Sequence, residues 1–437
     1  MKYSKLGKRI NKCYKQLTLK NLFINHFWLF TITSLLNILT GIGWLTTLFL
    51  PIFIYLMLFK GKMRGSLNIF DLLWILNFIW IIFTWTFNDY PHKGILILRC
   101  FSTQIAYMMT YWIARKSTFN YLKGIIETSY IPLTITCVIG IYCFFFPPTW
   151  YQAITDRYIA SKDIYMTETL IAELSRLRSI FDSPYTLSYF ISMTLIYEWF
   201  CMIKKERQFT TKYMIFIGLL ISTMILAMMR APIVCSLLSF ILAIFYGLRY
   251  KKSSSTTRKM IIALSIGLIG VFVVVKSLDD SFTKHIFSKY NSVTNEGGNF
   301  LMERLFLMNV EMTLEGDGTG RHAIYADKYP PNYSLRDGEY MKIIAEQGYI
   351  GFTIIILLFS LGLIKSFFNL KNLSFEFCLI CMLFITMIGA NPLSTADKYP
   401  IIFWLALGRI STYKNSIYGI NNYCNLQCSQ HFKNGIK

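Results

Sequence analysis

Residues 279–348 read DDSFTKHIFSKYNSVTNEGGNFLMERLFLMNVEMTLEGDGTGRHAIYADKYPPNYSLRDGEYMKIIAEQG. This is the longest polar interval in the chain, and it holds nearly half of the acidic residues. The segments on both sides are apolar runs of roughly 17 to 20 residues, the length that crosses a bilayer core of about 30 Å. We therefore expect the interval to be a loop outside the membrane, with any chemistry in it or beneath it.

The composition of the chain indicates a membrane protein. Of its 437 residues, 54% are hydrophobic and only 15% are charged, whereas soluble globular proteins carry roughly 25% charged residues. Only helices and closed barrels can span a bilayer, because every backbone polar group must be satisfied within it. The long apolar runs favour an all-α fold, a polytopic membrane helical bundle of about 12 transmembrane helices with a large, partly helical external loop. A soluble multidomain protein is excluded.

The predicted spans divide the chain into three parts. The spans lie at residues 22–40, 44–59, 68–87, 94–113, 124–146, 184–203, 213–229, 231–248, 260–276, 349–364, 374–390 and 400–411. Residues 1–276 contain the first nine spans and an external loop at 147–183. Residues 277–348 form the large loop, and residues 349–437 contain the last three spans and a tail.

The positive charge of the chain predicts its orientation. The formal net charge is +21, and the basic residues cluster in short connectors such as 2–20, 60–64 and 249–259. Short basic connectors remain on the cytosolic side of a membrane. Both termini are therefore expected in the cytosol, with the two long loops together on the other side. Nucleic acid binding is the rejected explanation of the charge, so no nucleic acid partner is expected.

Metal, disulfide and nucleotide sites are not expected. The ten cysteines lie in apolar runs or terminal segments, and Cys378 and Cys381 are predicted to serve only helix packing. The GDGTG run at 316–320 does not follow a strand, so it does not predict a nucleotide site. No metal-ligand spacing occurs, and no cofactor is expected. His285 and His322 are predicted to be polar surface residues.

Three arginines are candidates for binding a phosphorylated substrate. Arg230 lies between two apolar runs without an adjacent acid, and a charge at a membrane boundary tends to be retained for a role. Arg176 and Arg178 lie just before the span that starts at residue 184. A guanidinium donates paired hydrogen bonds to diphosphate and does not deprotonate. The alternatives are that Arg230 anchors the chain at headgroups and that the other two pair with loop acids.

The end of the large loop contains candidate carboxylates. Ser334 and Asp337 have the form of a capping box, which predicts a helix from about 335 to 347 that ends at Gly348. Asp337 can then be a cap, and Glu339 can belong to a salt-bridged face with Lys342 and Glu346. Alternatively, one of these carboxylates is a general base for a sugar hydroxyl.

Several of these motifs together resemble the O-antigen polymerase and ligase superfamily of bacterial membrane proteins. RLRSIFDSP at 176–184 is similar to the family's Arg-x-x-Gly-x-Phe-x-x-Pro, with Ser179 in place of glycine. MRA at 229–231 is similar to its Ser-Arg-Gly/Ala step. Further similarities are Arg304 followed by GDGTG at 316–320, DGEY at 337–340, EQGYIG at 346–351, NP at 391–392, and the run from FWL at 403–405 to Gly408.

The resemblance implies an inverting glycosyltransferase that uses glycans linked to undecaprenyl diphosphate, at the outer face of the bacterial cytoplasmic (inner) membrane. The large loop would be periplasmic. The reaction would polymerise repeat units into O-antigen or capsular polysaccharide, in lipopolysaccharide or other polysaccharide biosynthesis. A chain-length regulator and a flippase are expected as partners, besides the lipid bilayer.

The resemblance also implies roles for individual residues. Residues expected to bind the diphosphate or glycan are Arg176, Arg230 and Arg304 first, then Arg178, Arg321 and Arg336. Asp337 or Glu339 would activate the acceptor hydroxyl. Ligases of the superfamily have a His-Asn pair where this chain has Asp337 and Gly338, which favours polymerase. The alternatives are a ligase that transfers polymer to lipid A core and a lipid-linked oligosaccharide flippase.

Overall fold

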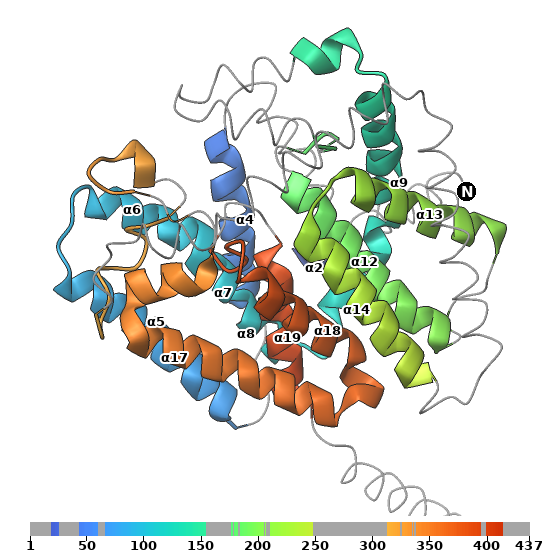
Figure 1. Ribbon diagram of the computed structural model, residues 1–437. Helices are drawn as coiled ribbons and strands as arrows, with labels where there is room; N and C mark the ends of the chain where they lie inside the picture. Colours follow the sequence, from blue (N-terminus) through green and yellow to red (C-terminus); the bar gives the residue numbers. More distant parts are fainter. Residues whose placement is uncertain are drawn as a thin grey trace, which may run out of the picture.

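The protein is mostly helical in the part that the structure describes (Figure 1). This computed structural model describes residues 19–25, 43–59, 66–153, 176–177, 179–181, 184–204, 206, 210–247, 313–323, 326–333, 335, 338–394 and 399–413. Within these residues no strand occurs, so the prediction of an all-α fold is confirmed for them.

The described chain up to residue 116 contains helices of different lengths. Its helices are α2 (Leu19–Ile24), α4 (Gly43–Leu58) and α5 (Ile69–Phe87). A further stretch is interrupted by a π-helical turn and comprises α6 (Lys93–Cys100), η1 (Phe101–Ile105), α7 (Ala106–Met108) and α8 (Thr110–Lys116).

The remaining helices form the middle and the end of the chain. They are α9 (Tyr121–Phe145), α12 (Pro184–Ile203), α13 (Thr211–Leu226), α14 (Arg230–Tyr246), α17 (Glu339–Phe368), α18 (Leu370–Thr386) and α19 (Pro400–Thr412). A short 3-10 turn, η4 (Ala326–Lys328), precedes α17. In Figure 1, α5 and α17 lie on one side, α12 to α14 on the other, and α18 and α19 between them.

Local sequence determines where several helices begin. Asn68 and Asp71 form a capping box at the start of α5. The Asn68 side chain accepts a hydrogen bond from the backbone amide of Asp71, and the Asp71 side chain accepts one from the backbone amide of Asn68. Asn120 caps α9 by accepting from the amide of Lys123, and Thr210 caps α13 by accepting from the amide of Tyr213. These side chains satisfy amides that the helix itself leaves unpaired.

Helix α12 is the centre of the bundle. Every residue from Leu187 to Ile203 is buried, and the helix packs against α9, α13, α14 and α18. Polar side chains within it therefore need partners inside the protein. Ser192 Oγ donates to the carbonyl of Pro232 at 3.1 Å and lies 2.8 Å from Ser236 Oγ, which joins α12 to α14.

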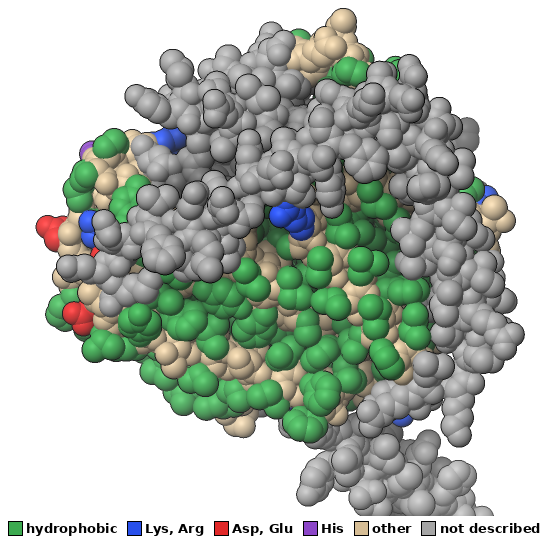
Figure 2. Space-filling model, in the orientation of Figure 1, with side chains coloured by type: hydrophobic (Ala, Val, Ile, Leu, Met, Phe, Trp, Pro, Cys, Tyr) green, Lys and Arg blue, Asp and Glu red, His purple; other side chains and the backbone are tan. Residues whose placement is uncertain are grey.

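The outer helices expose apolar side chains, as expected for surfaces in contact with lipid. On α5, the exposed residues Leu72, Leu76, Ile79 and Ile82 repeat at helical spacing. Figure 2 shows that the described part of one face is mostly hydrophobic, with a small group of basic side chains near its middle. Among the described residues, four helices, α5, α9, α12 and α17, are long and apolar enough to cross a membrane.

Contacts between helix ends define two ends of the bundle. At the first, here called the loop end, the rings of Tyr189 and Tyr399 stack with centroids 4.3 Å apart, so α12 and α19 begin side by side. There Glu339 N also donates to Ala390 O at 3.1 Å, which places the start of α17 beside the end of α18.

At the opposite end, here called the basic end, the start of α5 meets the last residues of α17 and α19. Asn68 Nδ2 and Lys365 Nζ both donate to the carbonyl of Ser411, each at 3.1 Å. Tyr246 OH donates to Lys371 O at 3.1 Å, which brings the end of α14 to the start of α18.

The helix bounds agree with most predicted spans. Nine predicted spans, beginning at 44, 68, 94, 124, 184, 213, 231, 374 and 400, each coincide with a helix or the broken α6–α8 stretch to within four residues at either end. The predicted span at 349–364 is the second part of α17, after a kink at Gly348. Most of the span at 22–40 and all of the span at 260–276 lie outside the described residues. The total of twelve spans and the periplasmic location of the loop therefore stay predictions.

The start of α17 differs from the prediction. The helix begins at Glu339, its N-cap is Gly338 with φ of 104°, and no side chain caps it. The predicted helix start at about residue 335 is therefore wrong, and Ser334 and Asp337 of the predicted capping box lie outside the described residues. The first turn is held instead by the hydrogen bond from Glu339 N to Ala390 O, a contact between distant parts of the chain. The predicted end at Gly348 is confirmed as a break, since its φ of 65° and ψ of −174° are not helical.

Candidate functional site

Two of the predicted substrate-binding arginines lie close together at the loop end. Arg176 NH1 is 3.5 Å from the sulfur of Met229, and Arg230 is the next residue, the first of α14. Leu177 N donates to Leu226 O at 3.3 Å, which fixes the segment before α12 against the end of α13. Residues about fifty positions apart in sequence are thus brought to one place, which we call the arginine pair.

Two left-handed turns shape the backbone around the arginine pair. Ser179 has φ of 58° and Met228 has φ of 54°, a region that glycine occupies without steric cost. Ser179 is buried, and its hydroxyl donates to Thr136 O at 2.7 Å, which stabilises the turn. The backbone conformation explains why a glycine suits this position in the motif that the sequence resembles.

The charge of Arg176 lacks an acidic partner among the described residues. Its only hydrogen bond there is to the sulfur of Met229, a weak acceptor. Its Nε atom is buried and has no hydrogen-bond partner in the structure. A buried guanidinium nitrogen without an acceptor is uncommon and calls for an explanation. Arg230, the first residue of α14, is solvent-exposed.

A second group of site residues forms where the glycine-rich segment 313–323 docks on the first part of α17. Asp317 N donates to Ala345 O at 2.9 Å, and Gly318 N donates to Glu346 O at 3.1 Å. Gly316 and Gly348 face each other so closely that a Cβ on Gly348 would lie 2.2 Å from Leu314 O. Only glycine permits this approach of two backbones, and the contact is also the place where α17 kinks.

The same segment is tied to α5 and to the turn before α6. Thr319 O accepts from Trp85 Nε1 at 2.7 Å and from Tyr90 OH at 3.2 Å. The hydroxyls of Thr319 and Thr84 lie 2.8 Å apart. Segment 313–323 is therefore held on both sides, which makes it a fixed part of the loop end.

His322 lies at the centre of this contact. It is fully buried, its amide donates to Glu346 Oε1 at 2.9 Å, and its ring nitrogens lie 3.0 Å from Asp317 Oδ2 and 3.1 Å from Tyr333 O. The prediction that His322 is a surface residue is wrong. Docking of the segment on α17 removes it from solvent, an effect that local sequence does not reveal.

Arg321 and Tyr333 lie beside the same histidine, and Tyr90 contacts the nearby Thr319. Arg321 NH1 lies 3.3 Å from Asp317 Oδ2, and about a third of the Arg321 side chain is exposed. Burial raises the pKa of Tyr90, and the nearby carboxylate of Glu346 raises it further. Burial likewise raises the pKa of Tyr333, with the Asp317 carboxylate adding to the effect. Both phenols therefore stay neutral hydrogen-bond donors at physiological pH.

Glu339 is buried at the start of α17, with both carboxylate oxygens in hydrogen bonds. Oε2 accepts from Leu393 N at 2.9 Å, and Oε1 accepts from Ser394 Oγ at 2.6 Å. Lys342 Nζ donates to the same Ser394 hydroxyl at 2.6 Å and is buried too. The carboxylate thus holds the segment between α18 and α19 against α17. Sequence patterns showed the acid but not these partners.

Four of the eight predicted site residues lie within the described chain, and they form two groups. Arg176 and Arg230 form the arginine pair, whereas Arg321 and Glu339 lie in the second group on α17. The other four, Arg178, Arg304, Arg336 and Asp337, are outside the described residues, as is His285. In the described chain, no group of three or more His, Cys, Asp or Glu residues could hold a metal ion.

Comparisons with known proteins do not assign a family. No protein-family model matches the chain, no curated protein matches it, and no solved structure matches it.

Proposed function

We propose that the protein polymerises oligosaccharide repeat units linked to undecaprenyl diphosphate into O-antigen or capsular polysaccharide, as an inverting glycosyltransferase. The observation that carries this proposal is the arginine pair, where Arg176 contacts Met229, the residue before Arg230, at the loop end and has no acidic partner in the described chain. The motif resemblance noted above adds support. In this proposal the loop end faces the outer side of the bacterial inner membrane, and both termini are cytosolic.

The arginine pair suits the chemistry of a lipid diphosphate leaving group. Negative charge grows on the diphosphate oxygen as the glycosidic bond breaks, and donors already in place stabilise that charge without reorganisation. Guanidinium groups bind phosphate oxygens with paired hydrogen bonds and stay charged. A position at the boundary between apolar helices also suits a substrate whose lipid remains in the bilayer. We assign diphosphate binding to Arg176 and Arg230, with Arg304 and Arg178 as further donors.

The docked segment 313–323 supplies a rigid wall for the glycan. Arg321 projects from it with about a third of its side chain exposed, and we assign it, with Arg336, to glycan contact. Because both oxygens of Glu339 are held by Leu393 and Ser394, we assign Glu339 a positioning role. Asp337 is then the first candidate for the base that accepts the proton of the acceptor hydroxyl.

Deletion of the gene followed by gel analysis of surface polysaccharide tests the proposal. Loss of a polymerase leaves single repeat units on the lipid core. Loss of a ligase leaves the core bare while lipid-linked polymer accumulates, and loss of a flippase leaves repeat units on the cytosolic side. Either of the last two patterns would replace the proposed activity.

Arg230→Ala tests the arginine pair directly. We expect long chains to disappear while the protein is made and inserted at the normal level, because the side chain is exposed and leaves the core unchanged. Lys93→Ala is the matched control, since Lys93 is also the first residue of its helix. Wild-type chain length in Arg230→Ala would remove this residue from the site.

A further inference from the structure

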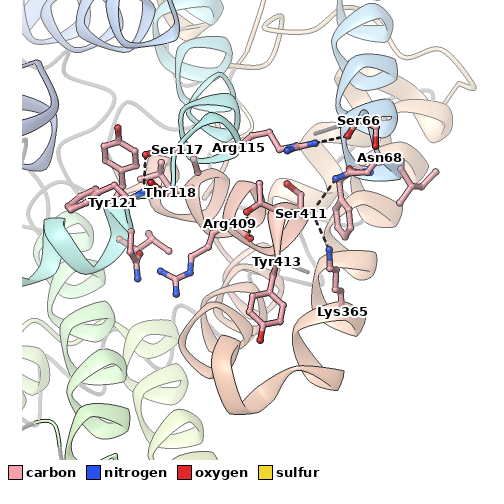
Figure 3. A pocket seen from close by; sticks show the side chains of 18 residues that line it. Ser66, Asn68, Arg115, Ser117, Thr118, Tyr121, Lys365, Arg409, Ser411 and Tyr413 are labelled. Atoms are coloured by element: carbon pink, nitrogen blue, oxygen red, sulfur yellow. Dashed lines mark hydrogen bonds between the residues drawn. The ribbon is translucent and has the colours of Figure 1, made fainter. Parts of the chain in front are cut away.

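A pocket lies at the basic end, opposite the arginine pair. Its volume is about 870 Å³, and residues from α5, α8, α9, α17 and α19, with the turns beside them, line it. Figure 3 shows its polar side chains converging between the α8–α9 turn and the ends of α17 and α19. This volume falls in the range of small-molecule sites, and the proposed polymerisation does not use it.

The lining of this pocket is basic. Its charged members are Arg115, Lys365 and Arg409, and no acidic side chain is among the lining residues. Two carboxylates outside the lining neutralise two of these charges, since Asp71 pairs with Arg115 and Glu376 pairs with Arg409. The third base, Lys365, is not neutralised in this way, so the pocket has a net positive charge.

Lys365 carries that remaining charge. Its ammonium donates to the carbonyl of Ser411 at 3.1 Å and lies 5.3 Å from the centre of the Phe70 ring. No carboxylate lies within salt-bridge distance of it in the described chain. Arg409 uses Nε for Glu376, at 2.7 Å, and its two terminal nitrogens have no hydrogen-bond partner among the described residues. These donors can bind an anion without breaking an existing bond.

The remaining lining suits an amphiphile. Hydroxyl and amide groups come from residues such as Thr118, Asn120 and Thr412, whereas Phe119 and Leu405 add apolar surface. Hydroxyls and amides can donate to phosphate oxygens. Apolar walls can contact the glycerol backbone and the first carbons of a lipid chain. Basic pockets between transmembrane helices are known to bind anionic headgroups.

We propose that this pocket binds an anionic phosphate group, with Lys365 and Arg409 as its main donors, and that a phospholipid headgroup is the source. The proposal does not depend on the polymerase activity. A phosphate on a soluble molecule would share the same chemistry, so the experiment separates the two sources. The pocket joins the ends of five helices, and a bound headgroup would connect them.

Native mass spectrometry of the full chain in detergent tests the proposal. The probes are phosphatidylglycerol, phosphatidylcholine and inorganic phosphate. We expect phosphatidylglycerol to bind at least about fivefold more tightly than phosphatidylcholine, because the choline group of the latter carries a positive charge toward Lys365. Inorganic phosphate at millimolar concentration is expected to leave lipid binding unchanged.

Two variants reduce the positive charge of the pocket by different means. Lys365→Gln removes a charge, whereas Asn120→Asp adds a carboxylate to the lining and keeps the helix cap, because aspartate caps as well as asparagine. Each is expected to weaken phosphatidylglycerol binding about fivefold. Lys371→Gln and Thr210→Asp make the same charge changes at residues that do not line the pocket, and we expect wild-type binding from both.

The outcomes separate the possibilities. If inorganic phosphate binds and competes while the two lipids bind equally, a soluble phosphate compound is the source. If Asn120→Asp and Lys365→Gln both bind phosphatidylglycerol as the wild type does, the proposal is wrong. Should Lys365→Gln not purify as a single species, Asn120→Asp decides the question, since its cap and its fold are retained.

Discussion

Arg115 at the basic end and Arg176 at the loop end have opposite surroundings. At the basic end, Arg115 is only 5% exposed, and its Nε and NH2 donate to the carboxylate of Asp71, each at 3.1 Å. The Asp71 carboxylate also accepts from Tyr111 OH at 2.6 Å. At the loop end, Arg176 contacts a methionine sulfur and Arg230 is exposed. Arg115 is thus held in an ion pair, whereas Arg176 has no acidic partner in the described chain.

The carboxylates explain this difference. At the basic end they pair with arginines, as Glu376 does with Arg409. In the described part of the loop end, buried carboxylates accept from neutral donors instead, Glu339 from Leu393 N and Glu346 from His322 N. A carboxylate whose oxygens already accept hydrogen bonds from neutral donors is not placed to neutralise a guanidinium group. The comparison teaches that an arginine paired with a carboxylate joins helices, whereas Arg176, which has no acidic partner in the described chain, remains available to a ligand.

Asp71→Asn tests the buried ion pair of Asp71 and Arg115 and has the largest expected effect. The change leaves the buried guanidinium of Arg115 without its counterion, which costs about 3 to 5 kcal/mol of folding free energy. We expect a strongly lowered unfolding temperature in detergent and a low yield of monodisperse protein. Adding Arg115→Gln should restore part of the loss, because no unpaired charge remains. A single variant as stable as the wild type would show that the pair is not structural.

Gly348→Ala breaks the contact between segment 313–323 and α17. A Cβ would lie 2.2 Å from Leu314 O at a residue with φ of 65°, so strain and overlap together cost about 3 kcal/mol. We expect a lower unfolding temperature and faster proteolysis near residue 317. Gly218→Ala is the control, because nothing lies within 4 Å of its Cβ and alanine favours a helix interior. Equal proteolysis of both variants would argue against the docked contact.

The length of the apolar runs predicted the helices well, because about 20 apolar residues are what a helix needs to cross a bilayer core. α12 was expected at 184–203 and lies at Pro184–Ile203. Gly348 was expected to end a helix, and it does kink α17. The start of that helix was missed by about four residues, since Glu339 N is held by Ala390 O rather than by a local cap.

The candidate site was harder to predict, because its contacts join distant segments. Arg176 and Arg230 were each selected from their position at a membrane boundary, but nothing in the sequence shows that Met229 brings them together. His322 was predicted at the surface, yet docking on α17 buries it fully. The glycines at 316 and 348 were the one signal for this contact, since two closely approaching backbones require them.

Glu339→Gln and Asp337→Asn compare a positioning acid with a candidate base. Glutamine keeps an oxygen for Leu393 N but weakens the bond with Ser394. We expect a loss of about 2 kcal/mol in stability or less, with long polysaccharide chains still formed. Asp337→Asn should abolish long chains at normal stability. Chain length on gels and unfolding in detergent measure the two effects. Loss of chains in a stable Glu339→Gln protein would make Glu339 the base.

Lys123→Ala breaks the most exposed ion pair of the bundle and should have the smallest effect. Lys123 Nζ lies 3.9 Å from Glu127 Oε1, and the two side chains are 47% and 38% exposed. Solvent screens such a pair, so its loss is expected to cost under about 0.5 kcal/mol. Lys123 is also near the positive end of the α9 dipole, which lowers the value of the pair further. Unfolding temperatures of this variant and of Asp71→Asn, measured together, compare an exposed pair with a buried one. A loss from Lys123→Ala as large as that from Asp71→Asn would mean that burial does not separate the two kinds of charge in this protein.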